Sequence, residues 1–291
     1  MLDTRPMSGA DFASLARDCE DFGFDLATLH PDHPSSSGVR GAGESLEVWT
    51  AATWALAATR RLTVLPDVIG LPYRPPGVVA KMAESLDRLS AGRIVLGLGS
   101  GGDDKAVAAF GLTVRSPSEK VAALQEAVSV IRQLWGPERA VVTFRGDHFA
   151  LDGASINPAP VRPIPIWLGV HAPKGWELVA RIADGWLPSS LALPPHDAAT
   201  ALRSIQVMAQ DHGRSPGSIE YAYNVTVFVG NPALAKVQGP APTFAGSPSH
   251  IADQLLGLAE SGFTVLNLWP APRTAEQPRL LAEQVVPLLR P

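Results

Sequence analysis

Short, nearly continuous apolar runs alternate along this chain with longer segments in which apolar residues recur every three or four positions. The runs are typical of strands buried on both faces, and the longer segments indicate amphipathic helices. Strands that alternate with helices in this way predict a parallel sheet. Over 291 residues they predict a (β/α)8 barrel, for which about 250 residues is usual. We expect a single α/β barrel domain over residues 1–291.

The expected strands number seven, whereas a barrel of this type needs eight. The natural place for the eighth lies ahead of the first helix, Gly9–Phe22, but residues 1–8 lack strand character. We therefore expect the first strand to be missing. Strained pairing of its two neighbours would then close the gap, or another segment or subunit would cover it. The seven strands begin near residues 24, 62, 94, 164, 185, 219 and 263, and a hairpin inserted around Arg145–Asp147 interrupts the alternation.

Charge and cysteine content exclude several classes of protein. The net charge is -4 and the basic residues form no stripe, so nucleic acids and anionic membranes are not expected partners. The single cysteine, Cys19, excludes an internal disulfide framework. No apolar run approaches the roughly 18 residues of a membrane span, and residues 1–6 lack the apolar stretch of a signal peptide. We expect a soluble, cytoplasmic protein.

The loops that follow the strands are where a barrel carries its chemistry. One of them, Gly97–Gly102, fits the pattern G-x-G-x-x-G. The acidic residue nearest to the spacing of a dinucleotide site is Glu119, which starts a helix, so a dinucleotide fold is not supported. Two interpretations stay open: a glycine loop whose backbone N–H groups hold one phosphate, and a tight turn without a ligand.

Two further strand ends carry histidines. Asp32 and His33 follow the strand at 24–29, where an imidazole beside a carboxylate can act as a general base or hydrogen-bond donor. A solvated loop pair is the alternative. His171 follows the strand at 164–168 and could help backbone N–H groups to bind an anion, or could be an ordinary polar loop residue. No second group of His, Asp or Glu has the spacing of metal ligands, so no metal site is expected.

Several motifs also occur in order along residues 10–290. They are Leu71–Pro76, Leu86–Arg93, Leu96–Gly101, Phe110-Gly111, Gly146–Phe149, Pro160–Gly169, Ala183–Trp186, Gly246–Pro248 and Val285–Arg290. Together they resemble the luciferase-like monooxygenase family of FMN- and F420-dependent oxidoreductases. The resemblance implies a (β/α)8 TIM barrel with an inserted hairpin segment. It also implies a cofactor that is either the deazaflavin coenzyme F420 or FMN.

The resemblance further implies functional residues. In many deazaflavin members an Asp-His pair like Asp32-His33 ends the second strand with the imidazole facing the ring, which implies a catalytic His33 oriented by Asp32. Asp67-Val68 matches a strand-end bulge that often carries a non-proline cis peptide against the ring. Two glycine-rich or polar loops match loops that contact the cofactor. The implied cofactor-binding residues are Asp67, Val68, Gly99, Ser100, Gly101, Gly102, Val170, His171 and Ala172.

Two positions depart from the family pattern. Relatives usually carry a large residue where Gly102 stands and often a Glu where Ala106 stands. The expected activity is that of an F420-dependent oxidoreductase, which moves a hydride between the deazaflavin and a small organic substrate, in a homodimer. The alternatives are an FMN-dependent monooxygenase and a degenerate, non-catalytic barrel subunit.

Overall fold

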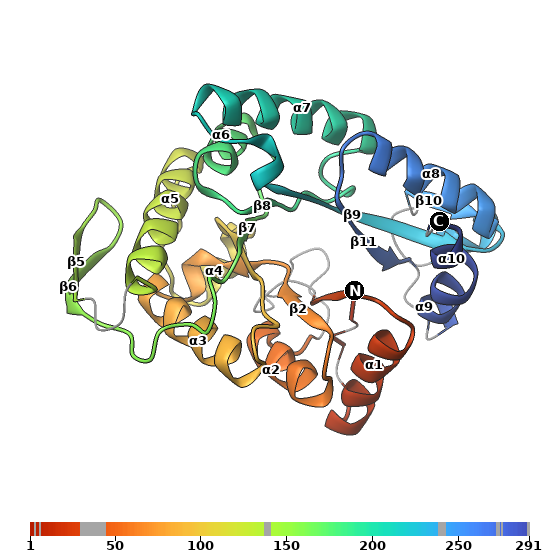
Figure 1. Ribbon diagram of the computed structural model, residues 1–291, viewed down its shortest axis with the longest axis horizontal. Coiled ribbons are helices and arrows are strands. Elements are labelled where there is room, and N and C mark those ends of the chain that lie inside the picture. The colour runs from red at the N-terminus through yellow and green to blue at the C-terminus, as the bar shows by residue number, and fades with distance from the viewer. Residues whose placement is uncertain are drawn as a thin grey trace.

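In the computed structural model, parallel strands lie at the centre of the molecule and helices pack around their outside (Figure 1). The structure describes residues 1–2, 4–5, 7–29, 45–136, 141–237, 243–271, 274 and 276–289. A π-helical turn, Leu281–Val285, joins the last two helices. The helices are α1 (Gly9–Asp21), α2 (Val48–Ala58), α3 (Pro76–Leu89), α4 (Asp104–Ala109), α5 (Pro117–Leu134), α6 (Pro173–Ile182), α7 (Pro195–Asp211), α8 (Pro248–Glu260), α9 (Glu276–Leu280) and α10 (Val286–Leu289).

The seven strands that the sequence predicts are all present. They are β1 (Leu26–Leu29), β2 (Thr63–Pro66), β4 (Leu96–Gly99), β7 (Ile166–Leu168), β8 (Gly185–Trp186), β9 (Glu220–Val229) and β11 (Val265–Pro270). β1 pairs with β2, a single bridge between Val64 and Ile94 links β2 to the segment leading into β4, and pairing then runs β4–β7–β8–β9–β11. Every one of these pairs is parallel, so the strands form the wall of an α/β barrel.

Three short elements were not predicted. They are β3 (Ile69–Gly70), which pairs with β4, β10 (Phe244–Gly246), which pairs with the end of β9, and helix α4. The predicted hairpin is formed by β5 (Val142–Arg145) and β6 (Ala150–Ala154), which pair antiparallel and project beyond α5 (Figure 1). The barrel therefore carries one protruding insertion, as expected.

No strand pairing joins β1 to β11 in the described part of the chain; Met1 and Leu2 lie between them. The Met1 ammonium donates to the Leu268 carbonyl at 3.0 Å, and the Leu2 N–H donates to the Thr28 carbonyl at 2.8 Å. Leu2 is fully buried but makes only one isolated bridge. The residues of 1–8 that the structure describes thus form no regular strand, which agrees with the expectation for this segment. A cavity of about 280 Å³, lined by both strands, remains beside Met1.

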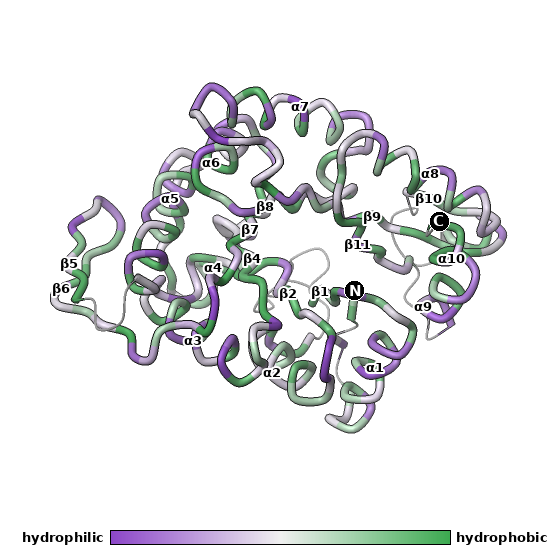
Figure 2. The backbone as a smooth tube through the Cα atoms, viewed as in Figure 1, coloured by the Kyte–Doolittle hydropathy of each residue, from purple (hydrophilic) through white to green (hydrophobic). Residues whose placement is uncertain are grey.

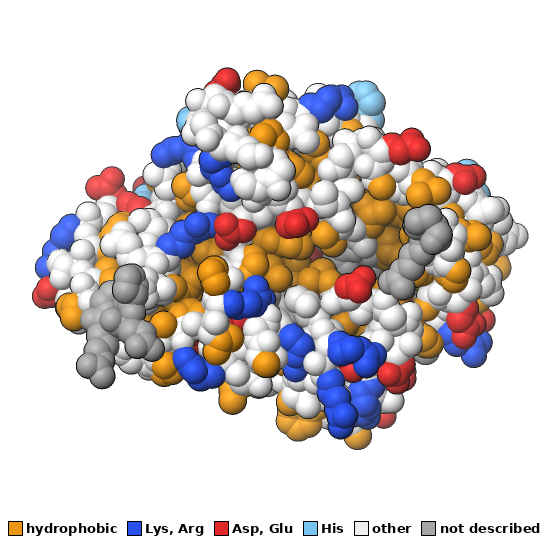
Figure 3. All heavy atoms as spheres, in the orientation of Figure 1, with side chains coloured by type: hydrophobic (Ala, Val, Ile, Leu, Met, Phe, Trp, Pro, Cys, Tyr) orange, Lys and Arg blue, Asp and Glu red, His pale blue; other side chains and the backbone are white. Residues whose placement is uncertain are grey.

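Helix starts and buried faces follow from local chemistry. Ser116 and Glu119 form a capping box at the start of α5: the Ser116 N–H donates to the Glu119 carboxylate at 2.8 Å, and Pro117 occupies the first helical position. The buried face of α5 includes Leu124 and Val128. Figure 2 shows hydrophobic residues along the strands and hydrophilic residues on outer turns. On the face shown in Figure 3, hydrophobic side chains form a band across the molecule. One side of the band carries α6 and α7, and the other side carries α2 and α3.

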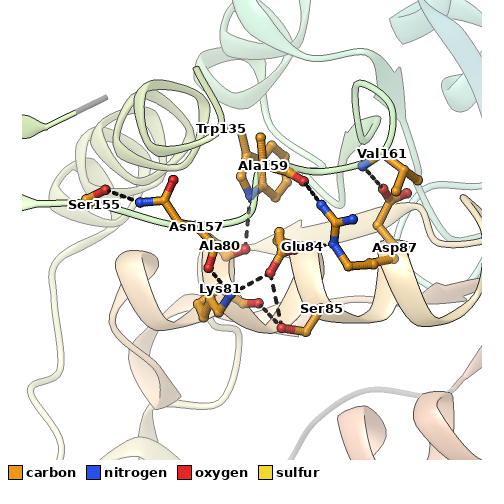
Figure 4. Close-up of polar contacts among 11 residues, drawn as sticks. Ala80, Lys81, Glu84, Ser85, Asp87, Trp135, Ser155, Asn157, Ala159 and Val161 are labelled. Atoms are coloured by element: carbon orange, nitrogen blue, oxygen red, sulfur yellow. Dashed lines mark hydrogen bonds and ion pairs between the residues drawn. The ribbon is translucent and has the colours of Figure 1, made fainter. Parts of the chain in front are cut away.

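The segment after the hairpin is fixed to α3 by a buried carboxylate (Figure 4). Glu84 is 1% exposed and accepts from Lys81 at 2.7 Å and from Arg88 at 3.1 Å. The same two cations donate to the carbonyls of Asn157 and Ala159. Arg88 belongs to the family-like motif Leu86–Arg93, which therefore helps to stabilise the barrel and lies outside the cavity described below.

Candidate active site

A cavity of about 520 Å³ lies at the carboxyl ends of the barrel strands. Its volume is within the range of roughly 300–1,000 Å³ that small-molecule sites occupy. Asp32 and His33 lie outside the described residues, so the structure places neither. The lining includes all nine predicted cofactor-binding residues, Asp67, Val68, Gly99, Ser100, Gly101, Gly102, Val170, His171 and Ala172. Residues from three separate strand ends therefore meet at one site, and their role in binding a cofactor remains a prediction.

One side of the cavity is built around the Asp67–Val68 peptide, which is cis as predicted. The Val68 side chain packs against Gly99 and Gly169, which end β4 and follow β7. A Cβ atom on Gly99 would lie 2.5 Å from Val68 Cγ2, and one on Gly169 would lie 2.9 Å from Val68 Cγ1. Both positions need glycine for this packing. Two glycines thus let one valine lie close against the strand ends, and such an apolar surface fits a flat ring system.

The glycine loop after β4 contributes packing at one position and open space at the next. Gly101 has a φ of +86°, and a Cβ there would lie 2.6 Å from Cγ of Pro72. Gly102 has no atom within 4 Å of an added Cβ, so it widens the cavity. The loop ends in two carboxylates, Asp103 and Asp104, which are unfavourable neighbours for a phosphate. Of the two open interpretations, this favours a turn shaped by packing over a phosphate cradle.

Among the described residues that line the cavity, Lys120 is the only lysine, and there is no arginine. Its ammonium lies 2.6 Å from the Asp104 carboxylate, and its side chain is 14% exposed. The ion pair compensates the charge of Lys120 and holds α5 close to α4. The remaining side chains that line the cavity beyond the predicted set are largely apolar, and include Pro117, Val121, Leu187, Leu191 and Trp269.

The loop after β7 is held in place by two hydrogen bonds. The indole N–H of Trp186 donates to the Val170 carbonyl at 2.9 Å, and the Ser189 N–H donates to Nε2 of His171 at 3.3 Å. Partial burial also lowers the pKa of His171. An accepting Nε2 requires a neutral imidazole with its proton on Nδ1. His171 therefore brings no positive charge to the cavity near neutral pH, and can donate a hydrogen bond through Nδ1.

Helix α6 begins at the same loop. Its N-cap residue, Ala172, makes no side-chain capping bond, and Pro173 occupies the first turn. Proline has no N–H to offer an anion, and the Gly175 N–H already donates to the Ala172 carbonyl at 2.8 Å, so most first-turn donors of α6 are missing or used. The anion binding predicted near His171 would therefore depend on the backbone N–H groups of Val170 and Ala172, just before α6, and not on an imidazolium.

A buried polar group lies beneath the cavity and was not predicted. We call the four side chains Thr28, Asp67, Asn224 and Asn267 the barrel quartet; they come from β1, the end of β2, β9 and β11. All four are at most 7% exposed. Nδ2 of Asn267 lies 2.6 Å from Asn224 Oδ1, 2.8 Å from Thr28 Oγ1 and 3.4 Å from Asp67 Oδ2. Asp67 and Asn224 also line the cavity, so the quartet forms its inner end.

The quartet changes the acidity of its one titratable member. Burial raises the pKa of Asp67 from 3.8 to about 7, against the opposing effects of a hydrogen bond from Asn224 and the Met1 ammonium. A carboxyl group that exchanges its proton near neutral pH beside a cavity is typical of functional sites. The available signal was three isolated polar residues inside apolar strand runs, at Thr28, Asn224 and Asn267, because polar side chains are rarely buried without a partner.

The described residues contain neither a group of metal ligands nor a membrane-spanning helix. No three His, Cys, Asp or Glu side chains in that part of the chain are grouped so that they could hold a metal ion. No helix there combines the length and the apolar character needed to cross a bilayer.

Comparisons with known proteins give a consistent result. An F420-dependent glucose-6-phosphate dehydrogenase of Kineococcus radiotolerans is 28% identical over 97% of this chain and 93% of its own length. The structure of an F420-dependent secondary alcohol dehydrogenase superposes with a TM-score of 0.82, at 20% identity, over 99% of this chain and 100% of that one. A long-chain alkane monooxygenase superposes with a TM-score of 0.81, at 17% identity, over 97% of this chain and 84% of that one.

These structural likenesses show the fold, an α/β barrel of this type. The sequence model of one protein family, described as luciferase-like monooxygenase, matches residues 1–238, which is most of the chain. The match agrees with the motifs found in the sequence, including the block around α3 that Figure 4 shows at a stabilising position. The chain belongs to the luciferase-like monooxygenase family.

Proposed function

We propose that this protein is an F420-dependent oxidoreductase that transfers a hydride between the deazaflavin and a small organic alcohol or carbonyl compound. One observation carries the proposal: the nine residues expected to bind the cofactor converge on one cavity at the carboxyl ends of the strands. The relative from Kineococcus radiotolerans is F420-dependent by name, as is the superposed alcohol dehydrogenase.

The chain's own residues suit a flat apolar cofactor. The Val68 side chain, packed against Gly99 and Gly169, offers a surface against which the ring would lie. Val170 and Leu187 add apolar side chains to the cavity wall. The backbone N–H groups of Val170 and Ala172, just before α6, would hold anionic groups of the cofactor. When bound, the deazaflavin supplies the carbon centre that accepts or returns the hydride. The protein's part is to orient the ring, to exclude water and to move the accompanying proton.

Proton transfer is assigned to His33, oriented by Asp32. When an alcohol is oxidised, the C–H bond breaks with its electron pair, and the proton of the O–H group must pass to a base. In His33→Ala, turnover should fall by roughly 10²–10⁴-fold with little change in cofactor affinity. His196→Ala is a matched control, because its side chain is 91% exposed on α7. Unchanged turnover of His33→Ala with a verified substrate would remove His33 from the reaction.

A second candidate is an FMN-dependent monooxygenase. It is favoured by the superposition on the long-chain alkane monooxygenase, whose TM-score is nearly equal to that of the alcohol dehydrogenase. Titration of the protein with F420 and with FMN distinguishes the two candidates, because each activity requires tight binding of its own cofactor. Failure to bind either cofactor would favour the third possibility, a non-catalytic barrel subunit.

The proposal extends to organisation and location. We infer a single domain over residues 1–291, a homodimer and a cytoplasmic enzyme, acting on a small molecule and not on nucleic acid. The one-barrel fold of the described residues supports the single domain. Light scattering in solution tests the homodimer, since a monomeric mass at micromolar concentration would contradict it.

A further inference from the structure

The function proposed above counts Asp67 among the residues around the cofactor but gives its carboxyl group no part in hydride or proton transfer. Asp67 is 7% exposed, and it is the one carboxyl-bearing residue among the described residues that line the cavity. Its backbone N–H is used in the fold, because it donates to the Leu29 carbonyl at 3.0 Å. Its side chain reaches the barrel quartet, in which each partner is a neutral side chain. A buried carboxyl group among neutral partners needs an explanation.

Counting hydrogens in the quartet shows that the ionised carboxylate is poorly solvated there. An ionised carboxylate can accept about four hydrogen bonds. Nδ2 of Asn267 has two hydrogens, and its two short contacts, to Asn224 at 2.6 Å and to Thr28 at 2.8 Å, use both. The contact of Asn267 with Asp67 at 3.4 Å is left weak, and the side chain of Asn224 is the remaining partner. The geometry therefore favours the protonated acid.

The charges that face Asp67 do not reverse this preference. The Met1 ammonium favours the carboxylate, but burial outweighs it. Lys120 borders the same cavity, yet its ammonium is paired with Asp104 at 2.6 Å. His171 also borders the cavity and is neutral, because its Nε2 accepts from Ser189. No unpaired cation among the described residues that line the cavity compensates a charge on Asp67.

The chemistry of the ligand makes the protonation state decisive. The pyrimidine part of a flavin or deazaflavin ring carries carbonyl oxygens, which accept hydrogen bonds. A neutral carboxyl group can donate to such an oxygen, whereas a carboxylate is an acceptor only and repels it. We propose, resting on the function proposed above, that Asp67 is a proton-dependent cofactor-binding residue: the cavity binds the deazaflavin tightly when Asp67 is a neutral acid and weakly when it is a carboxylate.

The test is the affinity for coenzyme F420 between pH 6 and pH 8.5, measured by fluorescence titration of the full chain. Binding linked to one proton that titrates near pH 7 should raise the wild-type Kd about 30-fold over this range. The side chain of Asp67→Asn cannot ionise and retains a hydrogen-bond donor. The 30-fold rise in Kd between pH 6 and pH 8.5 should therefore be absent from this variant. Asp152→Asn, whose side chain is 83% exposed on the hairpin, is the control and should behave as wild type. Equal pH dependence in wild type and Asp67→Asn would overturn the proposal.

A second measurement needs no folded variant. Calorimetric titration of the wild-type protein with F420 at pH 8, in two buffers of different ionisation enthalpy, gives the number of protons taken up on binding. About one proton per bound cofactor is expected. Uptake near zero would refute the inference while leaving the proposed function intact, because F420 would still bind. Absence of F420 binding at every pH would instead refute both.

Discussion

Replacing Asp67 by asparagine should stabilise the folded protein more at pH 8 than at pH 5. The folded-state pKa of about 7 lies above the ordinary value of 3.8, so the folded chain holds a proton that the unfolded chain has released. Stability therefore falls as the pH rises between these two values, and it is constant outside them. Asparagine resembles the neutral acid in shape and does not titrate, which removes this cost.

The magnitude follows from the shift. The difference, 7 − 3.8 = 3.2 pKa units, corresponds to about 4 kcal/mol of lost stability above pH 7. At pH 5 the loss is 5 − 3.8 = 1.2 units, or about 1.6 kcal/mol. Asp67→Asn should therefore gain roughly 2–3 kcal/mol more at pH 8 than at pH 5.

Urea denaturation at the two pH values, followed by circular dichroism, measures this difference. The free energy of unfolding is compared between wild type, Asp67→Asn and Asp152→Asn, whose exposed carboxylate should give no pH-dependent gain. A gain for Asp67→Asn that is the same at pH 5 and pH 8 would show that the carboxyl group is not held in its acid form, and the hydrogen count in the barrel quartet would be wrong.

Two other predictions rest on the cavity and on α3. Gly99→Ala places a Cβ 2.5 Å from Val68, so it should weaken cofactor binding at least tenfold and destabilise the fold by about 1–3 kcal/mol. In Gly102→Ala the new Cβ meets no atom within 4 Å, so stability should change by less than about 0.5 kcal/mol. Equal effects of the two variants would contradict the packing at Val68. Glu84→Gln should cost about 2 kcal/mol in urea denaturation, less than a fully buried pair because Lys81 and Arg88 are half exposed, and should leave cofactor affinity unchanged.

The strands of the barrel were predictable because burial on both faces produces nearly continuous apolar runs. The short elements were not. The three residues of β10 are strand only because they lie beside the end of the ten-residue β9, and β3 depends on its pairing with β4. Pairing between distant segments leaves no local pattern in so few residues.

The cavity was partly predictable. The resemblance identified its loops, and the barrel rule placed them at the strand ends, where all nine residues meet. The quartet was missed because Thr28, Asn224 and Asn267 are single polar residues far apart in sequence, and only the folded barrel brings them close to Asp67. The neutral state of His171 depends on a contact with Ser189 that no sequence pattern indicates.

The most direct test of the central claim is a titration of the dialysed protein with F420 and, separately, with FMN, in which tight binding is followed by reduction of the bound cofactor. We expect F420 to bind more tightly than FMN at pH 6, Gly99→Ala to weaken this binding, and an alcohol to reduce the bound F420 at its hydride-accepting carbon. Tight binding of FMN with no measurable binding of F420 would contradict the proposed F420 dependence and favour the monooxygenase.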